Sequence, residues 1–239
     1  MVKQNKNRIF FPREWINFRK ELNRDNKLGY KKYNSRMLYE LQMNTGARFN
    51  EASNVKVRDI DFENKNINLR IVKARTPYSS GIPRTIPIST KFRNRLYEYV
   101  KKNELKDSDF LGVGISQAGY NQLLKNKLRK AGIKDWNNFS SHNIRKTLET
   151  WLVALDVGSL KILKHFGHDK ATALKHYIQI DLFSIDDKIL IRKIIDDLYI
   201  NISDKEAILS KEILNIKGSL RTMQKELKQL KNKEGAEND

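Results

Sequence analysis

Apolar residues recur at the three- and four-residue spacing of an amphipathic helix along most of the chain. This pattern predicts one helix beginning at Ser89 and others over about 13–22, 33–43, 48–54, 117–130, 141–154, 159–166 and 170–179. In the helix over 117–130, the side chains expected to face the core are Leu123, Leu124 and Leu128. Gly46 suits a turn and Gly132 a helix end, because glycine readily adopts the left-handed backbone conformation.

One segment, residues 55–88, has a different pattern. Apolar and polar residues alternate there, which indicates a strand carrying Ile67, Leu69 and Ile71. A turn-rich stretch follows, and a second strand is expected over 84–88. Pro87 favours a short strand or a sheet edge, because proline cannot donate to a strand ladder. The pair predicts a β-hairpin, and the fold class is therefore mainly α with a small antiparallel β-sheet (α+β).

The C-terminal part of the chain has a third periodicity. Its apolar residues are separated by alternating steps of four and three, at Leu209, Ile213, Ile216, Leu220, Met223, Leu227 and Leu230. This heptad spacing is typical of a coiled coil, and it leaves open whether the helix pairs with another copy or packs on its own domain. We expect a short N-terminal segment (1–28), a main domain (29–183) and a C-terminal helical extension (184–239).

The charge of the chain is strongly positive. Of the 239 residues, 47 are Lys or Arg and 28 are Asp or Glu, which gives a formal net charge of +19. This surplus predicts a polyanionic partner, nucleic acid before an anionic membrane surface, but identifies no activity by itself. The absence of cysteine excludes disulfides and thiolate metal sites. No run of about 18 apolar residues and no secretory segment is present, so we expect a soluble, cytoplasmic protein without a membrane partner.

Candidate chemistry is concentrated in the segment 141–177 and in one upstream turn. Four residues of the segment stand at fixed spacing and have side chains suited to catalysis: His142, Arg145, His168 and Tyr177. His142 and Arg145 are three residues apart and would project from one face of a helix. A second arginine, Arg48, follows the turn at residues 45–47.

These residue types suit the attack of a phenol on a DNA phosphodiester. Cleavage without a metal ion needs fixed cations at the phosphate, a proton donor for the leaving oxygen and a positioned nucleophile. Arginine keeps its charge and binds phosphate through two parallel hydrogen bonds. Lysine or histidine can donate the proton, and a tyrosine hydroxyl can attack once a base takes its proton. We therefore expect no cofactor and no metal ion.

At these residues the chain resembles the tyrosine recombinase (phage integrase) family. Residues 45–51, TGARFNE, are similar to the family's T-G-x-R-x-x-E motif, and residues 142–145, HNIR, to its H-x-x-R motif. Residues 166–168, FGH, are similar to its L-G-H motif, and Tyr177 stands where the nucleophile is expected. Each motif is weak alone, but the four in this order are specific together. The resemblance covers about residues 30–183.

The resemblance implies the catalytic-domain fold of that family and a role for each motif residue. Arg48 and Arg145 would clamp the scissile phosphate, and His168 would hydrogen-bond to it. Tyr177 would form a 3′-phosphotyrosine and release a 5′-hydroxyl, while His142 would exchange the tyrosine proton. The region 29–183 would accordingly be the catalytic domain.

Further assignments follow from the same resemblance. The family carries a catalytic lysine, the general acid, on a β-hairpin, and Lys73 is the only lysine between Ile67 and Ile88. Glu51 would support the site without reacting. Two histidines match no motif position and are expected to be flanking or surface groups: His165 and His176.

The sequence departs from the family pattern at three points. Lys146 follows Arg145 where histidine is usual, and Phe166 replaces leucine. The family usually carries a separate domain of about a hundred residues before the first motif, whereas 44 residues precede Thr45 here. We therefore expect the clamp around DNA to be reduced or supplied by another molecule.

The function that the resemblance implies is site-specific cutting and rejoining of double-stranded DNA by a homo-oligomer, as an integrase or resolvase. Two alternatives stay open. A type IB topoisomerase uses similar chemistry as a monomer without a defined pair of sites. A non-catalytic architectural protein would bind DNA and form no covalent adduct.

Overall fold

The computed structural model describes residues 8–24, 35–70, 83–112, 115–167, 182–198 and 223–224. Contacts between residues divide the chain into two compact units, Met1–Ile200 and Asn201–Asp239. Three of the expected catalytic residues lie outside the described ranges: Lys73, His168 and Tyr177. The helix expected over 170–179 and every heptad position except Met223 lie outside them as well.

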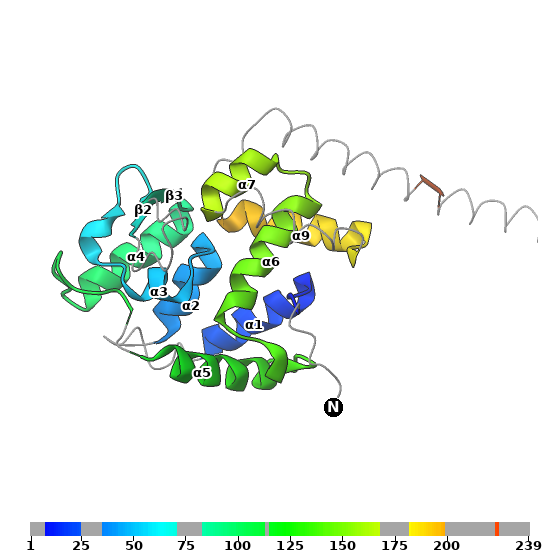
Figure 1. Ribbon diagram of the computed structural model, residues 1–239, viewed down its shortest axis with the longest axis horizontal. Coiled ribbons are helices and arrows are strands. Elements are labelled where there is room, and N and C mark those ends of the chain that lie inside the picture. Colours follow the sequence, from blue (N-terminus) through cyan, green and yellow to red (C-terminus); the bar gives the residue numbers. More distant parts are fainter. Residues whose placement is uncertain are drawn as a thin grey trace, which may run out of the picture. The chain divides into compact units, whose positions relative to one another are not determined.

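Helices make up most of the described chain (Figure 1). They are α1 Pro12–Arg24, α2 Ser35–Thr45, α3 Phe49–Ser53, α4 Thr90–Lys102, α5 Gln117–Lys130, α6 Ser141–Ala154, α7 Ser159–Phe166 and α9 Ile185–Leu198, with short 3-10 helices at Val57–Asp59 and Trp136–Asn138. The helices predicted from apolar spacing are confirmed to within about two residues at each end wherever the chain is described. Side-chain caps begin two of them, because the hydroxyls of Ser89 and Ser116 accept backbone N–H groups of the first turn.

The sheet has three antiparallel strands in the order β1-β2-β3: Ile60–Asp61, Asn66–Leu69 and Arg84–Pro87. The predicted hairpin pairing of β2 with β3 is confirmed, with Ile67 opposite Ile86. Pro87 lies on the edge strand β3, as expected of a residue that cannot donate to a ladder. Strand β1 was not predicted, because two residues are too few to show alternation. The mainly α architecture with a small antiparallel sheet is confirmed.

Helix α6 lies at the centre of the helical core. It contacts α2, α5, α7 and α9, and in Figure 1 it extends from α5 toward α7. Its apolar side chains Ile144, Leu148 and Trp151 are fully buried. The N-terminal segment completes this core, because the Trp15 ring packs on the Trp151 ring at 5.1 Å between centroids and Phe10 packs on Phe139 at 4.5 Å.

Helix α9 belongs to the first compact unit and contacts α1, α2 and α6. Ile191 and Ile195, four residues apart, are both fully buried. This spacing lines one face of a helix, so burial of that face accounts for the Ile-rich composition after residue 184. The boundary expected between residues 183 and 184 stays a prediction.

One expected core position is wrong. Leu124 and Leu128 of α5 are buried, but Leu123 is 39% exposed. Neighbouring positions on a helix are rotated by about 100°, so Leu123 and Leu124 cannot both point at the same narrow interface.

Among the described residues no helix is both long and apolar enough to cross a membrane.

Candidate active site

The turn between α2 and α3 begins the site. Gly46 has φ +66°, and Arg48 is the residue that caps α3. The Glu51 carboxylate accepts the Arg48 backbone N–H at 2.7 Å, so the first turn of α3 holds both residues in place. The first motif predicted from sequence thus forms a compact turn-to-helix unit.

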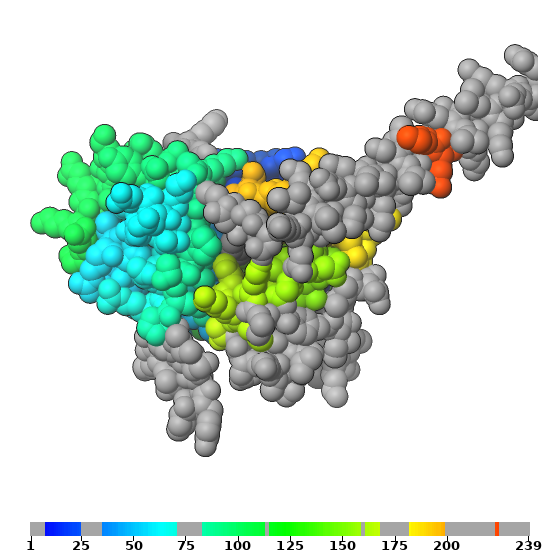
Figure 2. Space-filling view, turned by 90° about the horizontal axis from the view of Figure 1, so that it is seen from above, coloured from blue at the N-terminus to red at the C-terminus, as the bar shows by residue number. Residues whose placement is uncertain are grey.

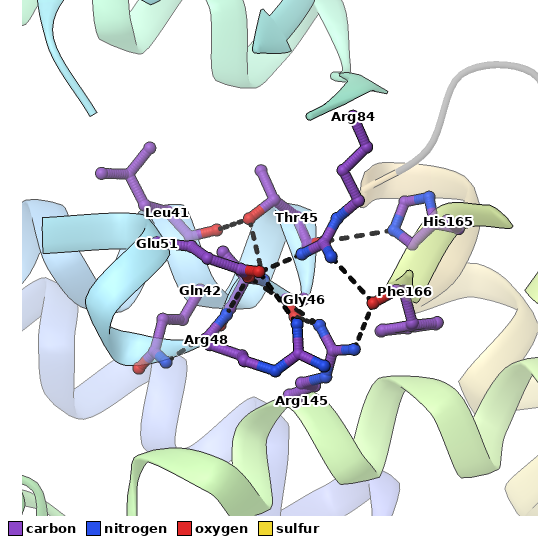
Figure 3. Close-up of polar contacts among 11 residues, drawn as sticks. Leu41, Gln42, Thr45, Gly46, Arg48, Glu51, Arg84, Arg145, His165 and Phe166 are labelled. Atoms are coloured by element: carbon purple, nitrogen blue, oxygen red, sulfur yellow. Dashed lines mark hydrogen bonds and ion pairs between the residues drawn. The ribbon is translucent and has the colours of Figure 1, made fainter. Parts of the chain in front are cut away.

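Three arginines from separate parts of the chain converge on the Glu51 carboxylate (Figure 3). Arg48 Nη1 lies 2.9 Å from Oε1, and Arg84 Nη2 lies 2.6 Å from Oε2. Arg145 Nη1 is farther away, 4.0 Å from Oε2. Two of these arginines, Arg48 and Arg145, are the pair that the motifs predicted for phosphate binding, and the fold brings them together.

Arg145 is held from several sides. Its side chain is buried, with 1% exposure, and its guanidinium lies 5.0 Å from the centre of the Phe166 ring. Nη1 donates to the Gly46 carbonyl at 3.0 Å, and Nη2 donates to the Phe166 carbonyl. These bonds tie α6 to the first motif and to the end of α7. A guanidinium fixed in this way needs no reorganisation when an anion arrives.

Arg84 is a site residue that sequence reasoning missed. It donates to the Phe166 carbonyl at 2.8 Å and to Glu51, so β3 is joined to α7 and α3. Figure 2 shows the yellow-green surface of α7 against the blue-green surface of β3, in agreement with their contact. The left-handed Gly167 (φ +61°) makes room for this side chain, because a Cβ there would lie 2.6 Å from Arg84 Nη1. The only sequence signal was an arginine at the start of a hairpin strand, which resembles any surface charge.

Burial and charge shift the pKa values of the cluster. Burial alone would raise the pKa of Glu51, but Arg84 and the other cations lower it below its usual range. Burial, and after it repulsion from Arg48 and Arg84, lowers the pKa of Arg145 to about 9. The carboxylates of Glu51 and Glu149 act in the opposite direction and raise this pKa. Burial also lowers the pKa of Arg84. Repulsion outweighs attraction at Arg145, so an anion bound here would relieve it.

The remaining predicted residues stand as follows. His142 is exposed in the first turn of α6, one turn before the buried Arg145. The side chain of Arg48 is 44% exposed, so this guanidinium is open to solvent. The described range 115–167 ends immediately before His168, and the other two predicted residues, Lys73 and Tyr177, also lie outside the described ranges.

His165, expected to be a flanking or surface group, is half-buried beside Phe166 and makes a specific contact with the first motif. Its Nε2 lies 3.1 Å from the Thr45 carbonyl oxygen, and its ring packs edge-on against Phe166. Burial and then the neighbouring Arg84 lower the pKa of His165 to about 3. The ring is therefore neutral near pH 7, and an Nε2–H group donates to Thr45. The contact could not be predicted from sequence, because a single histidine one residue before the third motif forms no periodic pattern.

Gly46→Ala should lower the free energy of unfolding by about 2–5 kcal/mol. Left-handed backbone costs an alanine about 1–2 kcal/mol, and the added Cβ would lie 2.4 Å from Phe166 Cε1, which forces the ring to shift. Gly132→Ala is the matched control, because Gly132 has φ +70° but no atom within 4 Å of the added Cβ. Urea unfolding of both variants measures the difference, and equal losses would contradict a role for the Phe166 contact.

His165 should make the protein less stable in mild acid. Its folded pKa of about 3 lies below the ordinary value of 6.5, so between these values the unfolded chain takes up a proton that the folded chain refuses. Stability is fully present above pH 6.5, and we expect a loss of about 2 kcal/mol from this group by pH 5. Urea unfolding between pH 5 and 7 measures the slope. His165→Asn should have a flatter profile, and an unchanged profile would contradict the assignment.

Comparison with known proteins identifies the family of the chain. The Phage integrase family matches residues 19–182. The tyrosine recombinase XerA of Saccharolobus solfataricus is 26% identical over 153 residues, 63% of this chain and 48% of that protein. XerH of Campylobacter jejuni is 24% identical over 147 residues, 62% of this chain and 41% of that protein. The chain thus spans about half the length of these curated relatives.

Solved structures share the fold. The Tn1549 transposon integrase in complex with circular intermediate DNA superposes with a TM-score of 0.57 at 18% identity, over 78% of this chain and 64% of that one. XerH bound to its difH substrate gives a TM-score of 0.55 at 19% identity, over 71% of this chain and 49% of that one. Because the family matches residues 19–182, which is most of the chain, and the fold is shared with these structures, this protein belongs to the phage integrase family of tyrosine recombinases.

Proposed function

We propose that the chain cuts and rejoins DNA at specific sites through a 3′-phosphotyrosine intermediate, as a recombinase or integrase. The observation that carries the proposal is the convergence of Arg48 and Arg145 on Glu51. These two residues come from motifs far apart in sequence, and the carboxylate binds one and lies 4.0 Å from the other. Family membership supports the same reaction class.

The arginines supply the positive charge that phosphodiester cleavage needs. Negative charge builds on the non-bridging oxygens in the transition state, and guanidinium groups already fixed in place stabilise it. The exposed guanidinium of Arg48 is reachable by a phosphate, whereas Arg145 is fixed by its bonds to two carbonyls. The step therefore requires no metal ion to neutralise the phosphate.

We assign the remaining steps to the other motif residues. The Tyr177 oxygen attacks phosphorus, the bond from phosphorus to the 5′-oxygen breaks, and the phosphate stays on Tyr177. His142 accepts the phenol proton, and Lys73 donates a proton to the leaving 5′-oxygen. His168 hydrogen-bonds to a non-bridging oxygen. Attack by a 5′-hydroxyl reverses each step and rejoins the strand without an external energy source.

Covalent trapping tests this function. A library of nicked duplexes is incubated with the protein, adducts are isolated under denaturing conditions, and the trapped DNA is sequenced. We expect adducts at one defined sequence, equally in excess EDTA. Loss of all adducts in EDTA, with recovery on adding Mg²⁺, would contradict the metal-free mechanism. Adducts at random sequence with relaxation of supercoils by monomers would indicate the topoisomerase alternative, and DNA binding without adducts an architectural protein.

We also propose that the working form is a homo-oligomer on double-stranded DNA in the cytoplasm. The reason is the heptad spacing from Leu209 to Leu230, since an isolated helix of that length is marginal in water unless its apolar stripe is buried.

A chain ending at Asp204 should keep Tyr177-dependent cleavage of a nicked duplex within about threefold, because one active site suffices to cut one strand. It should lose oligomerisation and exchange between two sites, because the apolar stripe is gone. Equilibrium sedimentation and a two-site recombination assay measure both. Full recombination by the shortened chain, with an unchanged oligomeric state, would show that the stripe does not join protomers.

A further inference from the structure

Three successive backbone carbonyls just before Arg48 each accept a hydrogen bond from the side chain of a different helix (Figure 3). The Thr45 carbonyl is bound by His165 of α7 at 3.1 Å. The Gly46 carbonyl is bound by Arg145 of α6 at 3.0 Å. The Ala47 carbonyl is bound by Gln42 of α2, also at 3.0 Å. This short turn is therefore fixed from three sides immediately ahead of the exposed arginine.

Gln42 belongs to no sequence motif, unlike Arg145, and it is more deeply buried than His165, the other donor outside the motifs. It is 1% exposed and lies on a helix whose other buried side chains include Met37, Leu38 and Leu41. Burying an amide among apolar side chains is costly unless both of its ends are hydrogen-bonded. Both ends are bonded here, because Nε2 donates to the Ala47 carbonyl while Oε1 accepts the Tyr120 hydroxyl at 2.5 Å.

Tyr120 fixes the orientation of this amide. Its ring is fully buried between Tyr39, at 4.6 Å between ring centres, and Phe49, at 5.1 Å. Burial raises the pKa of Tyr120 well above its ordinary value, so the hydroxyl keeps its proton and remains a donor. A donor at Oε1 leaves the NH₂ end of Gln42 facing the Ala47 carbonyl. The polar chain thus runs from α5 through α2 to the residue before Arg48.

The alternative is that Gln42 only satisfies buried polar groups. That role accounts for the two hydrogen bonds of Gln42 but not for the presence of an amide at this position. An apolar residue at position 42 would need no hydrogen-bond partner in this core. The Ala47 carbonyl belongs to the peptide group that leads into Arg48, and α3 after it has only five residues. Glu51 holds Arg48 from within this short helix, and the bond from Gln42 adds a constraint from α2 on the other side of Arg48.

We propose that Gln42 is a positioning residue that acts through Arg48, and that Tyr120 acts through Gln42. The inference rests on the proposed cleavage reaction, in which Arg48 binds the scissile phosphate. Releasing the Ala47 carbonyl lets the turn move, and a displacement of about 1 Å at a catalytic group costs on the order of 100-fold in rate. We expect the affinity for DNA to change little, because contacts with DNA away from the scissile phosphate do not involve this turn.

The test uses the full chain and the duplex selected by covalent trapping. For Gln42→Leu we expect single-turnover adduct formation at saturating DNA to slow about 10- to 100-fold. The dissociation constant for DNA should stay within about threefold. Met37→Leu is the matched control, since Met37 is equally buried on α2 and this swap conserves volume; its rate should be unchanged.

A double-mutant cycle separates positioning from packing. In an Arg48→Lys background, Gln42→Leu should slow the reaction by less than about threefold, because the group through which it acts is already changed. Tyr120→Phe keeps the ring and removes the hydroxyl, so it should slow the reaction on its own. Combined with Gln42→Leu, it should add nothing. If Gln42→Leu fails to fold, Tyr120→Phe and its cycle with Arg48→Lys carry the test.

Several results would overturn the inference. The inference is wrong if Gln42→Leu forms the adduct at the parent rate, or if Tyr120→Phe does so when Gln42→Leu does not fold. It is also wrong if Gln42→Leu slows the reaction as much in the Arg48→Lys background as in the parent, or if DNA affinity falls as much as the rate. In each case the parent protein still forms adducts, and the proposed function stands. If the parent itself forms no adduct, the proposed function and this inference are both wrong.

Discussion

Tyr177→Phe should form no detectable covalent DNA adduct, a loss of at least about 1,000-fold, while binding DNA as tightly as the parent protein. Phenylalanine keeps the ring and removes the oxygen that would attack phosphorus, so no ester can form. Affinity should persist because most of it comes from basic side chains that displace counterions from the phosphates. Denaturing gels measure the adduct, and titration at fixed salt measures the affinity.

The control for this prediction is Tyr97→Phe, since Tyr97 is 48% exposed on α4 and belongs to no motif. This variant should form adducts at the parent rate. The chain has nine tyrosines, so the assignment of Tyr177 needs such a comparison. If Tyr177→Phe still traps DNA, another tyrosine is the nucleophile, and mapping the modified peptide will identify it.

Glu51→Ala should lower the free energy of unfolding by about 3–5 kcal/mol, the usual cost of removing one partner from a buried group of charges. Glu51 is one of the few groups that raise the pKa of Arg145. Without it, Arg48, Arg84 and Arg145 repel one another with less compensation. Glu51→Gln should lose nearly as much, because it keeps the shape and removes the charge. Urea unfolding in chloride buffer measures both variants.

An anion should restore part of this loss. Inorganic phosphate placed among the three guanidinium groups replaces the missing negative charge, so it should stabilise Glu51→Gln more than the parent at equal ionic strength. Asp196→Asn is the control, because Asp196 is 51% exposed in its pair with Arg192 and should cost at most about 1 kcal/mol. A loss in Glu51→Gln no larger than in Asp196→Asn would show that Glu51 does not balance the arginines.

The sequence by itself determined the helices, the hairpin and the family. Apolar spacing depends on neighbours three and four residues away, and the four motifs are short runs of fixed spacing. Both signals are local, so the helices over 117–130, 141–154 and 159–166 were predicted with their observed bounds. The order of the motifs then indicated the candidate site, because the family fold brings those segments together.

Only the tertiary structure decided how the site is supported. Arg84 and His165 bind carboxylate or carbonyl oxygens of segments remote in sequence, and Gln42 joins the nearby Ala47 carbonyl to the remote Tyr120 hydroxyl. None of the three stands in a periodic pattern or in a motif. In sequence, Arg84 looks like a surface cation, His165 like a flanking group and Gln42 like an ordinary polar residue of a helix. The physical reason is that a buried polar side chain is placed by the partner it must bond. The remote partners become neighbours only when α2, α5, α6, α7 and β3 pack around the turn before Arg48.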